Sequence, residues 1–372
     1  MNADLIVQTP SRDYPVFIRE EFPEEVLQNL SNKLNASNAF VIIDENVDRL
    51  YHEKFHKKFE NAGLTYKKFV LASGETSKSE TNWFRMVNFL LENGARRNTP
   101  VFVAGGGVTG DSGGFAAATS LRGMPLIHIP TTLLAMVDSS IGGKTGINHP
   151  RGKNLIGSFY QPEAVIMDIE FLSTLPAKEW ANGLSEVLKY AAIEDPSLFE
   201  FVEKNYLKSS LPHAPENLTS LINRCVQIKA DIVEKDEKES GIRAYLNFGH
   251  TFAHALEKEA GYGKITHGEA VYIGMIAATK LSVQQGAGEL DEIHFNRFQP
   301  LYTFDKDINH LSVDNLIGRM HSDKKKTSGN LSVVLLRKWG DPYLTEIQDS
   351  GPIENAWKFA FSQIKKQDIE KG

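Results

Sequence analysis

The first half of the chain alternates short apolar runs with longer amphipathic segments, and this alternation limits the possible folds more than any other feature. Segments 46–62 and 80–93 repeat their apolar residues at helical spacing. The apolar runs between such segments are short enough to be strands, at residues 40–44, 67–71, 100–104, 125–130 and 164–168. Apolar strands separated by amphipathic helices are typical of a parallel sheet covered by helices on both faces. The sequence therefore predicts an α/β fold with a Rossmann-like parallel-sheet domain.

The pattern changes after residue 176, where helical spacing replaces the alternation. Beyond that point only residues 331–336 look like a strand, and helical spacing is found at residues 178–193, 217–235, 247–259 and 268–285. A chain of 372 residues is long enough for two domains. We therefore expect an α/β domain over residues 1–176 and a mainly helical domain over residues 177–372.

Charge and cysteine content exclude several classes of protein and site. The chain has 41 Lys and Arg residues against 47 Asp and Glu, a net charge of −6, which argues against nucleic-acid binding and a polybasic membrane anchor. Its single cysteine, Cys225, allows no intramolecular disulfide and no cysteine-based zinc site, so any metal must be held by His and carboxylate ligands. The N-terminus lacks a signal-peptide pattern, and the most apolar stretch, 270–278, is too short to span a bilayer. We therefore expect a cytoplasmic protein.

A glycine-rich segment, residues 105–111, directly follows the predicted strand at 100–104. Gly105, Gly107 and Gly110 fit the spacing of a dinucleotide fingerprint, in which the backbone approaches a pyrophosphate at a helix start. A purely structural turn explains such a motif about equally well. The acidic residue expected about 20 residues later is missing, but Asp44 at the end of an earlier strand could bind the ribose instead. The segment thus indicates a dinucleotide site that departs from the simplest Rossmann order.

A second polar loop, residues 138–145, ends in Gly-Gly-Lys-Thr without being a P-loop. The first glycine of that motif would fall at position 138, which is Asp138. Lys153 and Asn154 add a cation and an amide nearby in sequence. An anion- or hydroxyl-binding loop and two solvated turns are about equally good interpretations.

Three histidines in the second half could hold a metal. Asn247, His250 and His254 are spaced to share one face of a helix, and His267 lies at or just before a helix start. Glu186 together with two of these histidines would form a two-His, one-carboxylate site with an open position, which is typical of catalytic zinc. The alternative is that each histidine is an ordinary capping or core residue.

Several cations in the second half could bind an anionic substrate. They are Lys189, Lys229, Arg243 and the lysine run 324–326. A solvated charged surface is the ordinary explanation for such residues, especially for the run. Lys189 and Arg243, however, lie close in sequence to the candidate metal ligands, and cations around a metal suggest a substrate with phosphate and carboxylate groups.

Together these motifs resemble the 3-dehydroquinate synthase family of sugar-phosphate cyclases. The matching segments occur in the expected order between about residues 70 and 336: residues 105–111, 121–123, 129–134, 138–145, 152–154, 186–189, 243–254 and 267–270. The resemblance implies conversion of 3-deoxy-D-arabino-heptulosonate 7-phosphate to 3-dehydroquinate and phosphate in the shikimate pathway. It also implies NAD as a catalytic cofactor, a divalent metal (zinc most often, with cobalt as an alternative) and a homodimer.

The resemblance assigns roles to particular residues of this sequence. The metal ligands would be Glu186, His250 and His267. The 1–176 domain would bind NAD through Asp44, Ser73, Gly74, Glu75, Thr76, Ser77, Lys78, Gly107, Val108, Thr109, Gly110, Asp111, Thr131, Thr132, Asp138, Lys144, Lys153, Phe171, Leu172, Ser173 and Thr174. The catalytic and substrate-binding residues would be Asp138, Lys144, Asn154, Lys189, Lys229, Arg243, Asn247, His254, Lys325 and, contributed to a neighbouring subunit, Arg122.

Three other interpretations remain open. Related cyclases that make valiolone or deoxy-inosose products act on substrates without the carboxylate, whereas Lys229, Arg243 and Asn247 stand where the dehydroquinate enzyme has its carboxylate clamp. Metal-dependent glycerol-type dehydrogenases would share the two-domain plan but fit poorly with the loops at 138–145 and 152–154. A non-catalytic regulator that binds NAD or metal would be expected to have lost a ligand or clamp residue, and none is missing.

Overall fold

The computed structural model describes residues 2–207, 214–261, 263–323 and 330–365. The chain forms two compact units, the first of Met1–Pro176 with Ala214–Lys238 and the second of Ala177–His213 with Glu239–Gly372. The first crossing between them lies where the sequence changes character. The first unit also includes the helix α7 (Pro215–Lys235), which the sequence analysis assigns to the 177–372 domain. The apolar side of α7 is buried, and this helix packs against β1 (Leu5–Val7) and β2 (Tyr14–Arg19), contacts that sequence spacing does not reveal.

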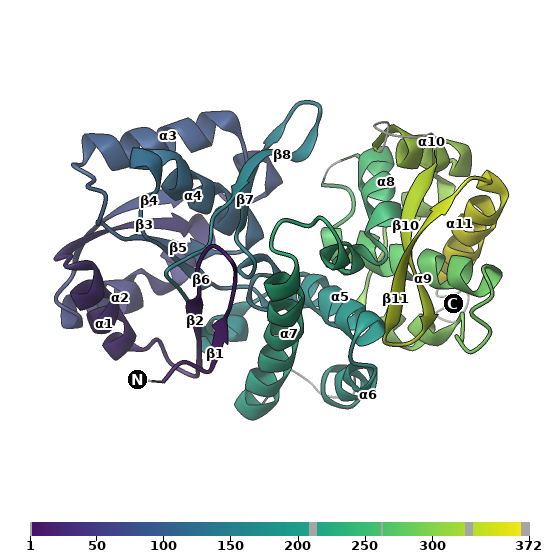
Figure 1. Ribbon diagram of the computed structural model, residues 1–372, viewed down its shortest axis with the longest axis horizontal. Coiled ribbons are helices and arrows are strands. Elements are labelled where there is room, and N and C mark those ends of the chain that lie inside the picture. Colours follow the sequence, from purple (N-terminus) through teal and green to yellow (C-terminus); the bar gives the residue numbers. More distant parts are fainter. Residues whose placement is uncertain (1, 208–213, 262, 324–329, 366–372) are drawn as a thin grey trace. The chain divides into compact units, whose positions relative to one another are not determined.

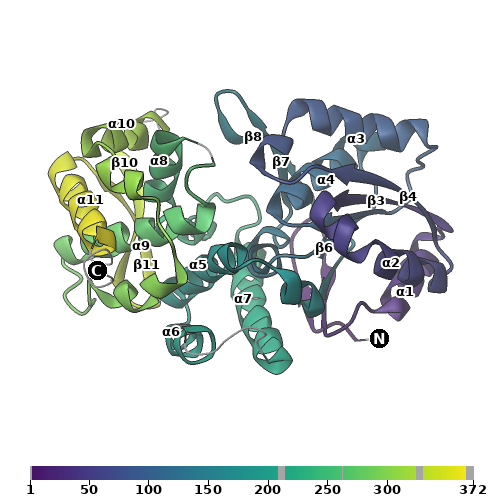
Figure 2. The same ribbon diagram turned by 180° about the vertical axis from the view of Figure 1, so that it is seen from behind.

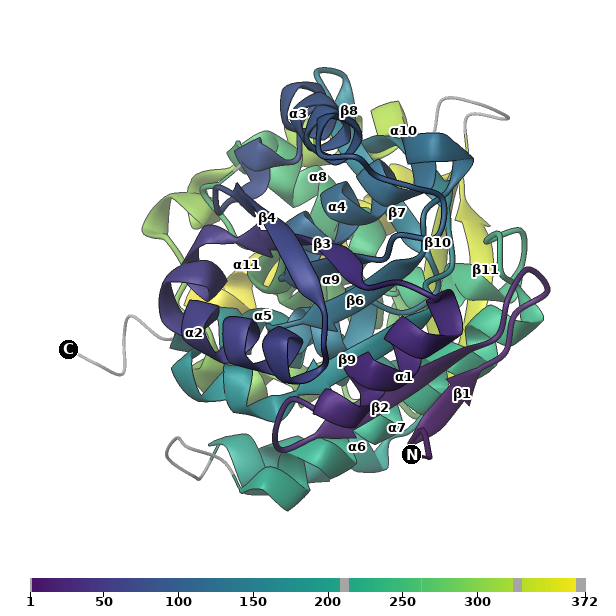
Figure 3. The same ribbon diagram turned by 90° about the vertical axis from the view of Figure 1, so that its left-hand side faces the viewer.

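The first unit is built on a seven-stranded sheet in the order β1-β2-β9-β6-β5-β3-β4 (Figure 1, Figure 3). All neighbouring strands are parallel except β1 and β2, which pair antiparallel. The remaining strands are β3 (Asn38–Asp44), β4 (Thr65–Leu71), β5 (Val101–Gly105), β6 (Leu126–Pro130) and β9 (Ala164–Asp168). The five runs expected to be strands are therefore confirmed, and the predicted α/β fold class is confirmed with them.

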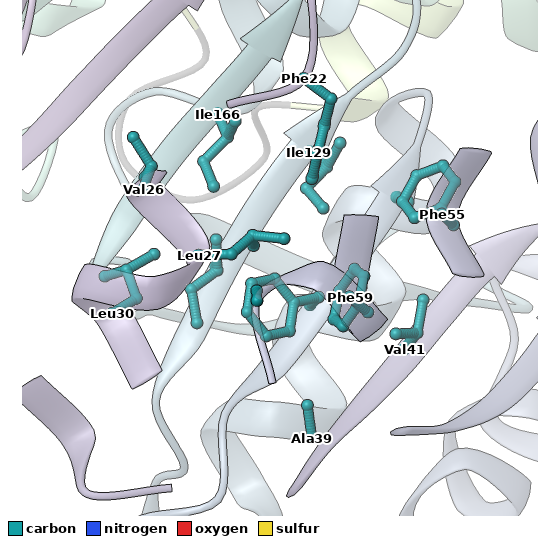
Figure 4. Close-up of a cluster of buried hydrophobic side chains, with 14 of the residues drawn as sticks. Phe22, Val26, Leu27, Leu30, Ala39, Val41, Phe55, Phe59, Ile129 and Ile166 are labelled. Atoms are coloured by element: carbon teal, nitrogen blue, oxygen red, sulfur yellow. The ribbon is translucent and has the colours of Figure 1, made fainter. Parts of the chain in front are cut away.

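Helices cover both faces of this sheet (Figure 1, Figure 2). One buried cluster joins α1 (Glu24–Leu34) and α2 (Glu45–Asn61) to the strands, and Figure 4 shows its side chains gathered between helix and strand. A second cluster joins α3 (Glu80–Glu92) and α4 (Gly107–Thr119) to the other face. Short helical segments complete the unit: η1 (Glu75–Ser77), η2 (Ser120–Arg122), the π-helical η3 (Ala135–Ser139) and η4 (Ile169–Thr174).

The polar loops of the sequence analysis are not simple turns. Asp138 lies in η3, and the chain then forms a hairpin of β7 (Lys144–His149) and β8 (Gly152–Phe159). Two glycines permit the close pairing, because a Cβ at Gly157 would lie 2.2 Å from the carbonyl oxygen of Thr145 and one at Gly146 would lie 2.6 Å from that of Ile156. Residues 138–143 are mostly buried, so the interpretation as a solvated turn is wrong there, whereas residues 150–151 form the exposed turn of the hairpin. These strands were not predicted, because glycines interrupt the alternation of polar and apolar residues that marks a strand.

The second unit is mainly helical. At its centre α9 (His267–Gln284) is buried on nearly all sides and packs against α5, α8, α11 and β10. The bounds of the other elements are α5 (Ala177–Ile193), α6 (Ser197–Val202), η5 (Glu203–Leu207), η6 (Ile242–Asn247), α8 (His250–Ala260), η7 (His294–Leu301), η8 (Lys306–His310), α10 (Val313–Asp323), β10 (Leu331–Lys338), β11 (Asp341–Ile347) and α11 (Ser350–Lys365). In the described part of the chain, no helix has the length and apolar character to cross a membrane.

The helix expected over residues 247–259 begins later than predicted. α8 starts at His250, and Asn247 ends the preceding 3-10 segment η6. Gly249 separates the two with a left-handed backbone, φ +80°. The expectation that Asn247 shares one helix face with His250 and His254 is therefore wrong, because the chain turns at Gly249 instead of continuing the helix.

Candidate active site

Three side chains of the second unit converge in a metal-binding geometry. Glu186 comes from α5, His250 from the first turn of α8 and His267 from the first turn of α9. One donor atom from each lies within 4.8 Å of the others. Both imidazole Nε2 atoms are 3.5 Å from the same carboxylate oxygen, Glu186 Oε1. Two imidazoles and one carboxylate form a donor set that suits zinc or another first-row divalent metal and leaves a coordination position open.

Close packing between α5 and α9 fixes two of these ligands. Gly268 Cα has no space for a side chain, because a Cβ there would lie 2.4 Å from Asn182 Cα. The Gly268 amide donates to Asn182 Oδ1 at 3.0 Å, and Ser185 Oγ donates to the Gly268 carbonyl at 2.7 Å. Because Gly268 and Ser185 are the chain neighbours of His267 and Glu186, these contacts set the separation of the two ligands. Thr266 and Glu269 add a reciprocal capping box at the start of α9.

His250 is oriented by the turn that precedes it. Its Nδ1 lies 3.3 Å from the backbone carbonyl of Phe248, which leaves Nε2 facing Glu186. The turn depends on Gly249, where a Cβ would lie 2.8 Å from Met275 Cγ and 2.9 Å from the Met275 backbone nitrogen. Positive φ and close approach to α9 both require glycine at this position.

Charges around the cluster are strongly coupled. Burial would raise the pKa of Glu186, but the positive charge of Lys189, its ion-pair partner one helical turn away, and then His250 hold that pKa well below its usual range. Burial likewise would lower the pKa of His267, but the neighbouring carboxylates of Glu186 and Glu257 raise it to about 10. Glu186 is therefore a carboxylate suited to a cation, and a metal at this site would compete with the proton of His267.

A pocket in the second unit adjoins the metal cluster. It contains the ligand His250 together with Asn247 and His254, two of the predicted substrate residues. The other lining residues are Thr251, Ala255, Lys258, Arg319 and Met320. Asn247 thus reaches the same pocket as His254 although it is not on the same helix. The side-chain amide Nδ2 of Asn247 donates to Glu239 Oε1 at 2.9 Å, which fixes the orientation of the Asn247 side chain.

Sequence reasoning missed Thr251, Lys258 and Arg319. Arg319 lies on α10 and donates to Glu259 Oε2 at 3.0 Å. Helical spacing in α10 marks only its buried side, so nothing in the sequence distinguishes Arg319 from an ordinary exposed cation. The two predicted cations Lys189 and Arg243 do belong to this unit, and both are almost fully buried. Buried cations need negative partners, and such an environment is suited to anionic ligands.

The glycine-rich segment of the first unit has the structural context of a nucleotide-binding turn. It links β5 to α4, with Gly106 as the N-cap residue and Gly107 as the first helical residue. A Cβ at Gly105 would lie 2.7 Å from Thr109 Cβ, and one at Gly106 would lie 3.1 Å from Thr132 Cγ2. Glycine is therefore needed for close approach, and the helix start presents unpaired backbone N–H groups of the kind that bind phosphate.

Other predicted cofactor residues follow the carboxyl ends of the same sheet. Thr131 and Thr132 come directly after β6, and the Thr131 amide donates to the Gly105 carbonyl at 3.0 Å. Asp44 ends β3 and accepts hydrogen bonds of 2.8 Å from Ser73 Oγ on both carboxylate oxygens. The carboxyl ends of parallel strands are where ligands bind in open α/β sheets.

The turn at residues 73–78 is tied to these strand ends. Lys78 forms an ion pair with Asp111 of α4, and the Lys78 carbonyl accepts from the Asn148 amide at 2.9 Å. Asn148 also donates to Glu75 Oε1 at 2.7 Å. Burial raises the pKa of Asp111, and the Lys78 charge opposes that shift. The structure therefore brings Glu75, Lys78 and Asp111 together.

The remaining predicted residues of the first unit have different surroundings. Lys229 Nζ on α7 donates to both the carbonyl and Oδ1 of Asp138, at 2.7 and 2.8 Å. Lys229 is thus grouped with Asp138 in the first unit, and Lys189 and Arg243 are in the second. Lys144 lies on β7 and Asn154 on β8, and both side chains are exposed. Asn154 has a left-handed backbone, φ +57°.

Residues 171–174 form the end of η4. The Phe171 ring is buried and stacks on Phe55 at a centroid separation of 5.9 Å, and Leu172 is buried as well. Thr174 Oγ1 lies 2.8 Å from the Tyr51 hydroxyl. Arg122 is exposed with a left-handed backbone, φ +65°. Lys325 lies outside the described residues.

Comparison with known proteins places these features in one family. The sequence profile described as 3-dehydroquinate synthase N-terminal matches residues 68–182, and the one described as 3-dehydroquinate synthase C-terminal matches residues 183–326. The 3-dehydroquinate synthase of Salinibacter ruber is 45% identical over 88% of this chain and 90% of its own length. That of Neisseria meningitidis serogroup C is 42% identical over 93% of this chain and 96% of its own length.

Solved structures share the fold. The 2-epi-5-epi-valiolone synthase of Streptomyces hygroscopicus, solved with NAD+ and Zn2+, superposes with a TM-score of 0.82 at 26% identity over 98% of this chain and 100% of its own. A 2-deoxy-scyllo-inosose synthase complexed with carbaglucose-6-phosphate, NAD+ and Co2+ also has a TM-score of 0.82 at 26% identity, over 95% and 99% of the two chains. With both domain profiles and full-length relatives above 40% identity in agreement, the chain belongs to the 3-dehydroquinate synthase family.

Proposed function

We propose that this protein is a 3-dehydroquinate synthase, which converts 3-deoxy-D-arabino-heptulosonate 7-phosphate to 3-dehydroquinate and phosphate. The observation that carries the proposal is the convergence of Glu186, His250 and His267 beside a pocket that also contains Asn247 and His254. The overall conversion is redox-neutral, so NAD would act as a catalytic cofactor and would not be consumed. It belongs to aromatic amino acid biosynthesis through the shikimate pathway.

The cofactors are NAD and a divalent metal, with zinc first and cobalt as the alternative. The metal would be held by Glu186, His250 and His267, whose donor set fits it. When bound, the metal supplies Lewis acidity to a substrate hydroxyl, and NAD supplies a reversible hydride acceptor. The structures of related cyclases solved with NAD+ and Zn2+ or Co2+ support this assignment.

The first unit would bind NAD. The backbone N–H groups at the start of α4 would bind the pyrophosphate, and the Asp44 carboxylate would accept hydrogen bonds from a ribose. Thr131, Thr132 and the Lys78–Asp111 pair lie on or beside neighbouring strand ends of the same sheet. The side chains of Phe171 and Leu172 are buried and support the end of η4. The backbone of this segment, together with Ser173 and Thr174, would then contact the cofactor.

The second unit would bind the metal and much of the substrate. Asn247 and His254 would hydrogen-bond substrate hydroxyls, since both line the pocket. Lys189 and Arg243 would neutralise phosphate and carboxylate charge, and Asp138, Lys144, Asn154 and Lys229 would contribute from the first unit. His254 would hold or move a proton at its imidazole, and the other residues would orient the substrate.

Another sugar-phosphate cyclase activity is the second candidate. It is favoured by the TM-scores of 0.82 to the valiolone and deoxy-inosose synthases, because enzymes with other products have the same fold. Identity of 26% to those enzymes, against 45% and 42% to relatives named 3-dehydroquinate synthase, favours the main proposal.

A substrate panel separates these activities. The purified protein, supplied with NAD and zinc, is given the heptulosonate phosphate, sedoheptulose 7-phosphate or glucose 6-phosphate, and phosphate release is measured. We expect release from the heptulosonate phosphate alone, with dehydroquinate as the carbon product. Turnover of one of the other sugars instead would establish the second candidate.

Two further expectations concern the assembly and its location. We expect a homodimer in which Arg122, exposed on the η2 segment, contributes to the partner's site. We also expect a cytoplasmic enzyme without nucleic-acid or membrane partners. Sedimentation and turnover of the purified protein, each compared between the parent and Arg122→Ala, would test the first expectation. A variant that remains dimeric but loses turnover would support a role of Arg122 in the partner's site.

A further inference from the structure

The two imidazoles of the metal cluster are held in different ways. Both direct Nε2 toward Glu186 Oε1, at 3.5 Å. The opposite nitrogen of His250 faces a neutral group, the Phe248 carbonyl, at 3.3 Å. The opposite nitrogen of His267 faces a charged group, Glu257 Oε1, at 3.8 Å. Only the His267 side of the site thus places a carboxylate behind the ring.

Glu257 is buried in an unusual position for a carboxylate. It lies on α8, seven residues after His250 and therefore two turns along the same side of the helix. Its exposure is 4%, whereas glutamate is rarely buried to this extent without a partner. Neither the cofactor residues nor the substrate residues assigned above include Glu257, which lies beside His267.

We propose that Glu257 is a positioning residue of the metal site, where it accepts the Nδ1 proton of His267 and so directs Nε2 of that ring toward the metal. The proposal rests on the proposed metal site. An imidazole that donates from one nitrogen to a carboxylate is fixed in tautomer and orientation, and its other nitrogen becomes a more basic ligand. Glu257 also adds a negative charge near the site in addition to that of Glu186, which favours a divalent cation.

The surrounding structure makes the effect specific to His267. The backbone at Gly268 is already fixed by Asn182 and Ser185, so the position of His267 Cα is determined independently of Glu257. What remains variable is rotation of the side chain, and the Glu257 carboxylate limits it. Loss of Glu257 should therefore weaken metal binding without displacing the helix start.

The test measures metal affinity and spectra without substrate. Zinc dissociation constants are determined by competition with a chromophoric chelator, and the visible absorption of the Co2+-loaded protein is recorded, for the parent, Glu257→Gln and Glu257→Ala. Glu259→Gln is the matched control, because it removes a carboxylate from the same helix that pairs with Arg319 and Asn315 instead of His267. Circular dichroism of the metal-free proteins checks that each variant is folded.

We expect Glu257→Ala to weaken zinc binding about 10- to 100-fold and to shift the Co2+ bands, since outer carboxylates of metal sites have effects of this size. Glu257→Gln retains an acceptor oxygen and should lose less, on the order of tenfold. Glu259→Gln should match the parent in both readouts. Affinities of both Glu257 variants within twofold of the parent would overturn the inference, and Glu257→Gln alone decides if the alanine variant does not fold. A parent protein that binds no metal would instead overturn the proposed site itself.

Discussion

At the scale of single residues, the histidines that could bind a metal lie at a different place from the histidine that could move a proton. Glu186, His250 and His267 converge on one point, whereas His254 lines the adjoining pocket and is exposed there. The sequence identified a two-His, one-carboxylate site, but its spacing left open which two of three histidines were ligands. In the structure His267, distant in sequence, is brought next to His250 by the packing of α8 on α9, so the donor atoms that converge are those of Glu186, His250 and His267.

Replacement of His254 tests this separation. We expect His254→Ala to lower kcat by about 10²- to 10⁴-fold, the usual contribution of a group that moves a proton in the transition state. Stability should change by less than about 0.5 kcal/mol, because the side chain is exposed. Steady-state kinetics and zinc stoichiometry are measured together. Full turnover would remove His254 from the mechanism, and loss of zinc would reassign it as a ligand.

His128 gives a pH-dependent prediction away from the active site. It lies on β6 against Gly110 and Gly114 of α4, and burial lowers its pKa to about 4. In the unfolded chain the pKa is about 6.5, so between these values the unfolded state binds more protons and stability falls as pH falls. From pH 7 to pH 5 this group should cost about 2 kcal/mol of unfolding free energy.

Chemical denaturation of the metal-free protein at pH 7 and pH 5 measures this cost. His128→Gln removes the titrating group and should lose correspondingly less stability over the same interval. Equal losses in the parent and the variant would show that His128 does not contribute to acid sensitivity.

At the scale of elements, the five central strands were predictable, but strands β1 and β2, and β11 in the half expected to hold a single strand, were not, nor were the breaks in the helices. Apolar runs marked the five central strands because both faces of a parallel sheet are buried. The break at Gly249 was hidden because Asn247, His250 and His254 fit helical spacing by coincidence. The β7–β8 hairpin was missed because its glycines and polar residues follow turn statistics.

The contact between α5 and α9 gives the prediction at this scale. In Gly268→Ala the new methyl group would overlap Asn182 Cα, so the two helices must separate and the Glu186–His267 distance must increase. We expect a loss of about 1–3 kcal/mol of stability and zinc binding at least about tenfold weaker.

Gly318→Ala is the matched control for this substitution. Gly318 lies in the middle of α10 on its exposed side, with open space around its Cα. Alanine at this position should leave the free energy of unfolding unchanged or raise it by up to about 1 kcal/mol. Thermal unfolding and zinc competition are measured on both variants. A Gly268→Ala protein that retains parental stability and affinity would contradict the account of how the ligands are spaced.

At the scale of the whole molecule, the features suited to a dinucleotide and those suited to a metal lie in different compact units. The first unit has the glycine-rich turn and the strand ends suited to a dinucleotide, and the second has the metal cluster and its pocket. Family resemblance predicted this division of roles, since ordered motifs are preserved along the chain. The return of α7 to the first unit, with Lys229 bound to Asp138, was beyond sequence reasoning because it depends on tertiary packing alone.

In the proposed reaction NAD would be regenerated in every turnover, and a divalent metal held by Glu186, His250 and His267 would be required. The most direct measurement follows phosphate, dehydroquinate and NADH during turnover of the heptulosonate phosphate, with NAD far below the substrate concentration, before and after a chelator is added. We expect equal amounts of phosphate and dehydroquinate, many turnovers per NAD, no net NADH, and arrest by the chelator that zinc reverses. NADH that accumulates in proportion to product, or turnover that continues in the chelator, would contradict the proposal.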